Sequence, residues 1–288
     1  MVYSRAMNPN ASKFRYGIVL LCCLGWLAGC SSDTKTEDAS QYKDTPVEEL
    51  YNQAYDLMAK EKYKQAADAF DEVERQHPYS AWATKAQLMA AYAYYQAERY
   101  TESQLALDRF IQLHPGHDDI AYAYYLKAMN AYDQISDVSR DQSMTQEALD
   151  ALREVVRRFP SSSYAKDAKL KIDLTLDHLA AKELKIGRFY QNRQIYTAAI
   201  NRFRNVVDQY QTTSVVPEAL HRLTECYVAL GIMDQATATA SVLGHNYPGS
   251  EWYQYSYNLL TTGKNELPKP TGQNSDKSFI GKALDSVF

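Results

Sequence analysis

The sequence predicts an all-α protein folded as a right-handed superhelical solenoid of about five helix pairs. Glycine and proline, which interrupt helices, are scarce, at 11 and 9 of 288 residues. Apolar residues recur at helical spacing over long stretches, and no clear alternating strand pattern is present. Five segments also end in related phrases, which are QHPYS, LHPGH, RFPSS, QYQTT and NYPGS.

The spacing of these phrases indicates a helical repeat. Their reference positions are Pro78, Pro115, Pro160, Gln211 and Pro248, at intervals of 37, 45, 51 and 37 residues. These intervals are near, and longer than, the 34-residue tetratricopeptide period. Within the segments, small residues at positions 8 and 20 let two antiparallel helices approach, and large residues at 11, 17 and 24 fill the space between them. The alternative is a plain helical bundle with chance alanines.

We expect the tetratricopeptide-like domain to cover residues 46–260. Its five repeats are placed at about residues 47–80, 84–117, 120–162, 165–213 and 217–250. The first helix is expected to begin with a capping box, in which Thr45 caps, Pro46 takes the first helical position and Glu48 lies three residues after the cap. The third repeat carries an insertion around residues 136–145, which displaces its first helix.

The N-terminal residues predict an exported lipoprotein. Residues 1–29 combine a basic start, a short apolar run and a small-residue end, which is typical of a secretory signal peptide. The stretch LAGC, ending at Cys30, matches the lipobox at every position, so the chain resembles a bacterial lipoprotein precursor. That resemblance implies diacylglycerol on the Cys30 sulfur, an acyl chain on its amine, and sorting to the outer membrane because Ser31 follows. The alternative is a buried N-terminal helix with a stray cysteine.

Two further segments offer little to a core. Residues 30–45 hold the lipidated cysteine and a polar, flexible tether. Residues 261–288 are expected to form a linker and a short amphipathic tail. The tail has a narrow apolar face at i, i+4 spacing, made by Phe279, Ile280, Ala283, Leu284, Val287 and Phe288. A frayed, unstructured terminus is the alternative.

Composition and motifs argue against several classes of function. Without residues 1–29 the chain holds 28 basic and 35 acidic residues, and a net charge of −7 disfavours general nucleic-acid binding. Cys226 is then the one free thiol, so no disulfide can form within the mature chain. Catalytic and phosphate-binding motifs are absent from the sequence, so we expect no enzymatic activity and no cofactor. His114 and His117 lie in an inter-repeat turn, where turn chemistry is favoured over a metal site.

The first helices of the repeats provide a candidate substrate groove. Counting along each helix places a row of tyrosines on the concave face, which are Tyr51, Tyr55, Tyr92, Tyr95, Tyr122, Tyr125 and Tyr132. Tyrosine combines apolar area with a polar tip, which suits a groove that binds peptide segments and stays soluble. The alternative is that individual tyrosines pack between repeats.

A cluster of cations in the fourth repeat provides a candidate partner-binding surface. Residues 180–210 hold six cations against two acids, in a chain that is otherwise acidic. The candidate residues are Lys182, Lys185, Arg188, Arg202 and Arg204. We expect Arg188 and Arg202 to be exposed, and arginine suits bidentate pairing with the carboxylates of a partner. The alternative is a solvated helix face.

The lipobox, the tether and the five repeats together resemble the BamD family, also known as ComL or YfiO-type lipoproteins, of the bacterial β-barrel assembly machinery. The stretches QHPYSAWATKAQLMAAYAYYQAERYTESQLALDRFIQLHPGHDDIAYAYYLKAM and RFPSSSYAKDAKLKI carry most of the resemblance. It implies a non-enzymatic scaffold, anchored by lipid on the periplasmic face of the outer membrane, that promotes folding and insertion of barrel proteins. QYQTTS departs from the proline that the family usually has in the fourth repeat.

The same resemblance implies partners. The C-terminal repeats are expected to bind the periplasmic domains of BamA, and BamC and BamE are expected to make further contacts. The N-terminal repeats are expected to receive unfolded outer-membrane proteins. The alternative is another outer-membrane repeat lipoprotein, such as a pilus-assembly pilotin.

Overall fold

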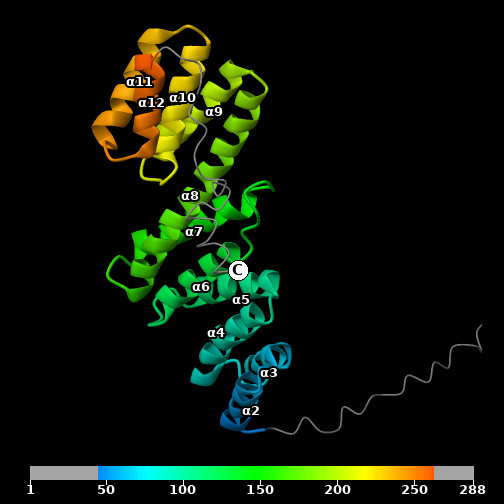
Figure 1. Ribbon diagram of the computed structural model, residues 1–288. Coiled ribbons are helices and arrows are strands. Elements are labelled where there is room, and N and C mark those ends of the chain that lie inside the picture. The colour runs from blue at the N-terminus through cyan, green and yellow to red at the C-terminus, as the bar shows by residue number, and fades with distance from the viewer. Residues whose placement is uncertain (1–44, 263–288) are drawn as a thin grey trace, which may run out of the picture. The chain divides into compact units, whose positions relative to one another are not determined.

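The computed structural model describes residues 45–262, and the regular structure in that range consists of eleven α-helices without a strand (Figure 1). The helices are α2 (Val47–Ala59), α3 (Tyr63–Gln76), α4 (Ala81–Gln96), α5 (Tyr100–Leu113), α6 (Ile120–Tyr132), α7 (Ser143–Arg158), α8 (Ser163–Asn192), α9 (Tyr196–Gln209), α10 (Val216–Ala229), α11 (Met233–Asn246) and α12 (Glu251–Thr262). The predicted signal peptide, Cys30, nearly all of the tether and the amphipathic tail lie outside the described residues.

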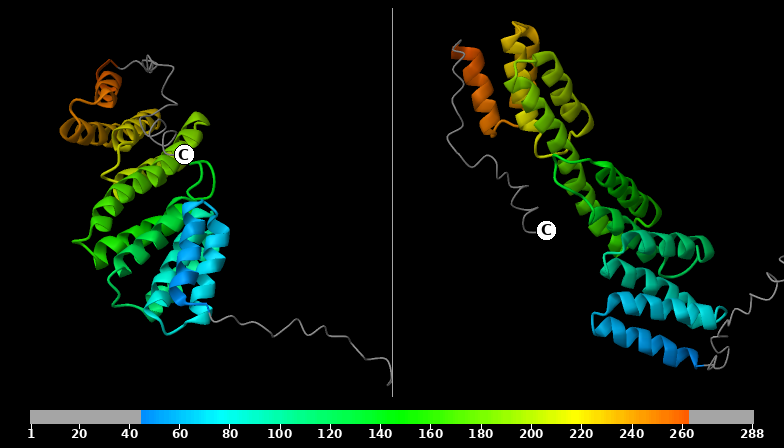
Figure 2. Two further views of the ribbon diagram at one scale, coloured as in Figure 1. Left: turned by 90° about the horizontal axis from the view of Figure 1, so that it is seen from below. Right: turned by 90° about the vertical axis from the view of Figure 1, so that its right-hand side faces the viewer.

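The helices from α2 to α11 form five pairs that follow one another in chain order (Figure 2). Each helix packs against the one before and the one after it, and α12 packs on α10 and α11. Successive first helices also contact one another, from α2 with α4 to α10 with α12, so they line the inner side of the stack. This arrangement confirms the predicted all-α, tetratricopeptide-like solenoid of five helix pairs.

The proline phrases end the second helices as predicted. α3, α5, α7 and α11 each end two residues before the proline of their phrase, because proline cannot continue a helix. α9 ends two residues before Gln211, so the fourth pair stops at the same place without a proline.

The turn between the two helices of a pair has the same backbone in four pairs. Each turn contains one residue with positive φ, and these are Glu61, Glu98, Gln194 and Gly231. The next backbone N–H reaches back to a carbonyl of the first helix, as from Lys62 to Leu57 at 2.9 Å. This is the Schellman ending of a helix. The third pair differs, because residues 133–142 separate α6 from α7.

Small and large residues pack as their repeat positions predict. Fully buried alanines at positions 8 and 20, such as Ala54 and Ala66, let paired helices approach. Gly187 takes position 8 in α8, directly under the ring of Phe203. The fully buried rings of Phe70 and Phe203 each contribute roughly 2–3 kcal/mol to stability through the apolar area that they remove from water.

The longest helix, α8, joins two hydrophobic clusters. Ala168, in its first half, belongs to a cluster with α6 and α7, whereas Ala180 and Leu184 belong to a cluster with α9, α10 and α11. The 30-residue length of α8 accounts for the long interval between Pro160 and Gln211. The insertion in the third repeat accounts for the 45-residue interval that precedes it.

The predicted capping box at the first helix is wrong in its register. α2 begins at Val47, and Pro46 stands at the N-cap position with an extended ψ of 136° and no side-chain cap. Side-chain caps do occur at later first helices, where the hydroxyl of Ser80 accepts from the Ala83 N–H and that of Ser162 from the Ala165 N–H.

Candidate functional site

Six tyrosine rings form a continuous row across the second, third and fourth pairs, five of them on first helices and one, Tyr100, at the start of α5. We call this row the tyrosine belt, and its members in order of ring contact are Tyr100, Tyr95, Tyr92, Tyr122, Tyr164 and Tyr125. Neighbouring ring centroids lie between 5.2 and 6.5 Å apart, within the range of favourable aromatic pairs. All six residues are partly exposed. The belt therefore offers ring surface from α4, α5, α6 and α8 in one place.

Two aspartates hold tyrosines of the belt in place. The hydroxyl of Tyr95 donates to Asp133, which follows α6, and that of Tyr125 donates to Asp167 in α8. Each bond crosses from one helix pair to the next, so it fixes the ring relative to its neighbours. Burial, and then the hydrogen bond to the carboxylate, raise the pKa of Tyr95 and of Tyr125. Burial likewise raises the pKa of Tyr122, so these hydroxyls stay protonated at neutral pH.

The belt contains four of the seven predicted groove tyrosines, which are Tyr92, Tyr95, Tyr122 and Tyr125. The prediction is wrong for Tyr132. This residue is only 6% exposed and packs within the third pair under the ammonium group of Lys171, so it lines no groove. Tyr51 is half-buried against Phe70 and Trp82 and contributes to packing of the first pair.

Tyr55, the remaining member of the prediction, is 56% exposed on α2. Sequence reasoning missed Tyr164 and Tyr100 as members of the belt. A signal for Tyr164 exists in the sequence, because it lies two residues after a capping serine, as Trp82 and Trp252 do. An aromatic residue at that position recurs in the first helices.

The predicted cation cluster is not one exposed surface. Lys182 donates to the backbone carbonyls of Ser139 and Arg140 at 3.0 Å each, and so holds the segment between α6 and α7, residues 133–142, against α8. Arg202 pairs with Glu183 on the facing helix at 3.1 Å. Lys185 and Arg204 are the two members whose residues are exposed.

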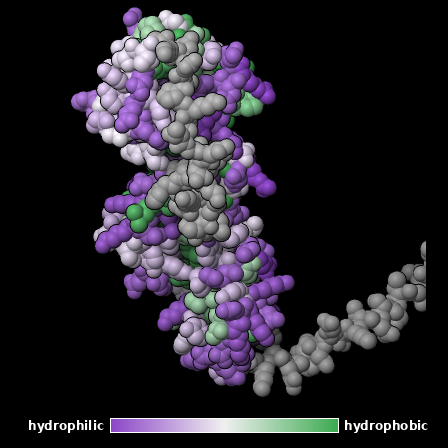
Figure 3. All heavy atoms as spheres, viewed as in Figure 1, coloured by the Kyte–Doolittle hydropathy of each residue, from purple (hydrophilic) through white to green (hydrophobic). Residues whose placement is uncertain are grey.

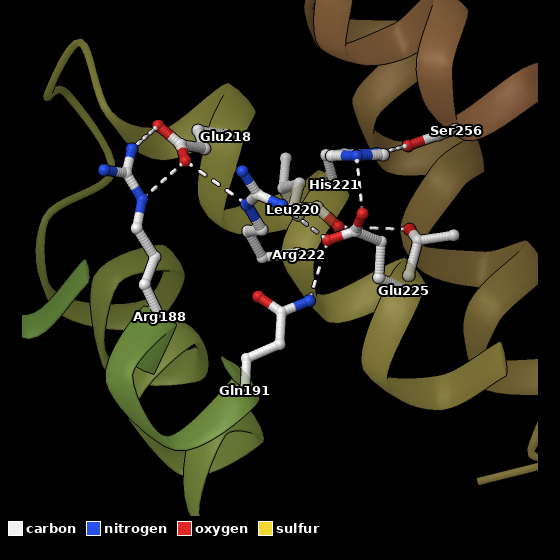
Figure 4. Close-up of polar contacts among 9 residues, drawn as sticks. Arg188, Gln191, Glu218, Leu220, His221, Arg222, Glu225 and Ser256 are labelled. Carbon is white, nitrogen blue, oxygen red and sulfur yellow. Dashed lines mark hydrogen bonds and ion pairs between the residues drawn. The ribbon is translucent and has the colours of Figure 1, made fainter. Parts of the chain in front are cut away.

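Arg188 belongs to a polar network that joins α8, α10 and α12 (Figure 4). Its guanidinium forms two hydrogen bonds with Glu218, one of them at 2.7 Å. Arg188 and Arg202 are only partly exposed, with side chains 40% and 43% accessible, and each already forms an ion pair with an acid of a neighbouring helix. The sequence showed the cluster of cations. It did not show that Glu218 and Glu183, which lie on other helices, face Arg188 and Arg202.

Glu225 lies at the centre of this network and is 7% exposed as a residue. Arg222 donates to it at 3.0 Å, Gln191 donates at 2.7 Å, and the Nε2 atom of His221 lies 3.3 Å from its second oxygen. Burial pushes the pKa of Glu225 up, but these hydrogen bonds and charges outweigh burial and lower it to about 2. His221 in turn shares a hydrogen bond of 2.8 Å with Ser256 of α12.

The two histidines of the second inter-repeat turn have structural partners. His114 Nε2 lies 3.0 Å from the side-chain oxygen of Gln87, and His117 Nδ1 accepts the Asp119 N–H at 3.1 Å. Both rings pack on Phe110.

Among the helices between residues 45 and 262, none is both long and apolar enough to cross a membrane.

Comparisons with known proteins agree on one family. Residues 43–262 match the family model of YfiO, described as an outer membrane lipoprotein. A relative from Caulobacter vibrioides, named outer membrane protein assembly factor BamD, is 47% identical over 259 residues, which is 90% of this chain and 85% of the relative. A relative of the same name from Rickettsia prowazekii is 47% identical over 239 residues, covering 83% of this chain and 94% of its own.

One solved structure, a thermophilic tetratricopeptide-repeat protein of Thermus thermophilus, is 16% identical and covers 75% of this chain and 98% of its own. Its TM-score of 0.33 is too low to carry an argument.

Proposed function

Because the chain belongs to the YfiO family of outer membrane lipoproteins, we propose that it is a lipid-anchored, non-catalytic scaffold that binds unfolded barrel proteins on the tyrosine belt. Its role as an outer-membrane protein assembly factor follows from relatives of that name at 47% identity over most of the chain. The comparisons do not favour the pilotin alternative. The observation that carries the binding proposal is the continuous, partly exposed row of rings.

The spacing of the belt suits an extended peptide. Alternate side chains of a β-strand lie on one face about 6.6 Å apart. The ring centroids of Tyr92 and Tyr95 are 6.4 Å apart, and those of Tyr92 and Tyr122 are 6.5 Å apart. Strands of outer-membrane barrels alternate apolar and polar side chains and carry aromatic girdles. An extended barrel segment could therefore insert successive outward-facing side chains between these rings.

The fixed rings favour binding of many related segments. Asp133 and Asp167 hold the hydroxyls of Tyr95 and Tyr125, so little side-chain freedom is lost when a peptide binds. Aromatic surface accepts diverse apolar side chains, as an assembly factor with many barrel substrates requires. This mode of action needs no reacting group, which supports a non-catalytic role.

We place the partner subunits at the C-terminal pairs. As the family resemblance implies, the periplasmic domains of BamA are the proposed main partner, and BamC and BamE are proposed as further contacts. Of the five predicted cations, Lys185 and Arg204 are exposed and available to an acidic partner, whereas Arg188 and Arg202 act indirectly by fixing α8 to α10 and α9. Exposed rim charges of this kind steer association more than they add affinity.

The proposed anchor is Cys30, carrying diacylglycerol and an N-acyl chain on the periplasmic face of the outer membrane. Two or more acyl chains suffice for stable attachment. Cys30→Ala is expected to leave a longer, unprocessed chain that is missing from the outer-membrane fraction. Normal processing and retention of that variant would refute the anchor.

The binding proposal is tested with a photo-crosslinking amino acid placed at Tyr92 or Tyr125 in the full chain. Crosslinks to barrel proteins during their assembly are expected at both positions. Tyr79 is the matched control, because it is fully exposed and lies in the α3–α4 turn, away from the belt. Equal capture at Tyr79 and at the belt positions would contradict the proposal.

A further inference from the structure

The turns inside the helix pairs share a backbone but differ in chemistry along the chain. The residue after the positive-φ position is charged in the first two pairs, as Lys62 and Arg99, and apolar in the last two, as Ile195 and Ile232. All four residues stand at the N-cap position of the next helix with similar backbone angles. The fold therefore does not require an apolar residue at this position.

The apolar side chains at the last two turns are exposed. We call them the apolar edge, and they are Phe189, Ile195, Leu230, Ile232 and Met233, each between 40% and 50% exposed. Single exposed apolar residues are ordinary on protein surfaces, but a group at one edge of adjacent repeats indicates a contact surface. In Figure 3 hydrophobic atoms gather at the upper end of the molecule, where Figure 1 places the α10–α11 turn.

The chain returns to this edge when it leaves the last helix. α11 runs antiparallel to α10, and α12 runs antiparallel to α11, so α12 is parallel to α10 (Figure 1). His221 of α10 and Ser256 of α12 occupy corresponding positions and hydrogen bond at 2.8 Å, which fixes this register. Thr262 therefore lies at the same end of the fifth pair as Leu230 and Ile232.

We propose that the apolar edge is the docking site of residues 279–288 of the same chain. This segment, SFIGKALDSVF from Ser278 onward, carries apolar residues at i, i+4 spacing with polar residues between them. Its apolar stripe matches the chemistry of the edge, and burying the two against each other removes apolar area from water on both sides.

The length of the connection favours docking within one chain. About 16 residues separate Thr262 from Phe279, and a flexible linker of that length has an end-to-end distance of about 20–24 Å. Packed helices lie about 8–10 Å apart, so the α10–α11 turn is about one helix spacing from the end of α12. A short linker that can reach across this span gives an effective concentration on the order of millimolar, far above that of a separate chain.

The test places a photo-crosslinking amino acid at Ile232 in the full chain, in detergent-solubilised outer membranes. Mass spectrometry is expected to find crosslinks to residues 279–288. Mixing isotope-labelled and unlabelled chains is expected to show that both ends of each crosslink come from one molecule. The matched control is the same amino acid at Lys62, the equivalent position of the first pair, which is expected to give no crosslink to the tail.

A second arm changes the tail and leaves the folded helices untouched. Ile280→Asp combined with Leu284→Asp is expected to reduce the Ile232 crosslink at least tenfold, whereas Lys277→Ala combined with Asp276→Ala is expected to retain it. Crosslinks from Ile232 to a second copy, to another subunit or to no site at all would overturn the proposal. So would an undiminished crosslink in the Ile280→Asp, Leu284→Asp variant.

Discussion

Arg188 of α8 and Glu218 of α10 face each other across the boundary between the fourth and fifth helix pairs. The Nε of Arg188 donates to one oxygen of Glu218 at 2.7 Å, and its Nη2 donates to the other. Arg222 also donates to Glu218 at 3.3 Å, and the Glu218 side chain is 10% exposed. A nearly buried carboxylate held by two cations ties α8 to α10 and fixes the last two pairs relative to each other.

Replacing Arg188 by leucine is expected to lower the free energy of unfolding by roughly 1–3 kcal/mol. The change leaves Glu218 nearly buried with Arg222 as its remaining cation, which limits the loss compared with a fully orphaned charge. Urea unfolding, followed by circular dichroism, measures this loss of unfolding free energy. Lys185→Leu, three residues earlier and exposed, is the matched control and is expected to stay within about 0.5 kcal/mol of the unmodified protein. Equal effects of the two changes would contradict a structural role for the Arg188 pair.

Glu225 is expected to make stability depend on pH in the acid range. Its pKa in the folded protein is about 2, below the ordinary 4.5, so it stabilises the fold above about pH 4.5 and this contribution is lost as pH falls toward 2. Glu225→Gln is expected to cost roughly 2–4 kcal/mol at pH 7, and the difference from the unmodified protein is expected to shrink with acidification. Unfolding free energies from pH 7 to pH 3 check this. A difference that is constant across that range would show that the Glu225 charge is not responsible.

Gly187→Ala is expected to destabilise the fourth pair. An added Cβ would lie 2.4 Å from a ring atom of Phe203, which is fully buried and cannot move without disturbing its neighbours. Overpacking of this kind costs about 1–3 kcal/mol, which thermal unfolding detects. Gly116→Ala is the control, because a Cβ there meets no atom within 4 Å. A variant at Gly187 as stable as the one at Gly116 would mean that α8 and α9 separate easily.

Much of the fold could be predicted from the sequence because tetratricopeptide packing is local. Small residues such as Ala54 and Ala66, and a large one such as Phe70, recur at fixed positions, and each packs mainly within its own pair or the next. The helix stops two residues before each proline follow from backbone chemistry alone. α12 lies beyond the last predicted repeat, and within residues 45–262 no second helix follows it to complete a pair.

The site was predictable only in part, because its decisive contacts join residues far apart in the chain. Tyr95 meets Asp133 and Arg188 meets Glu218, and no spacing rule connects these positions. Counting along the first helices found four belt tyrosines but could not tell Tyr132, which is buried, from Tyr125, which is partly exposed. The cation cluster could be recognised in the sequence. The acids that form ion pairs with Arg188 and Arg202 come from neighbouring helices, so the sequence alone did not show these pairs.

Binding of extended aromatic peptides to the tyrosine belt is the central claim, and a titration tests it most directly. The probe is a fluorescent ten-residue peptide with aromatic residues at alternate positions, and a peptide of the same composition with its aromatic residues adjacent serves as the comparison. Tyr92→Ala combined with Tyr122→Ala is expected to weaken binding of the alternating peptide at least tenfold, or about 1.4 kcal/mol. Tyr79→Ala is expected to leave it unchanged. Circular dichroism checks that the belt variant is folded. If the folded belt variant binds the alternating peptide with the same affinity as the unmodified protein, the account is contradicted.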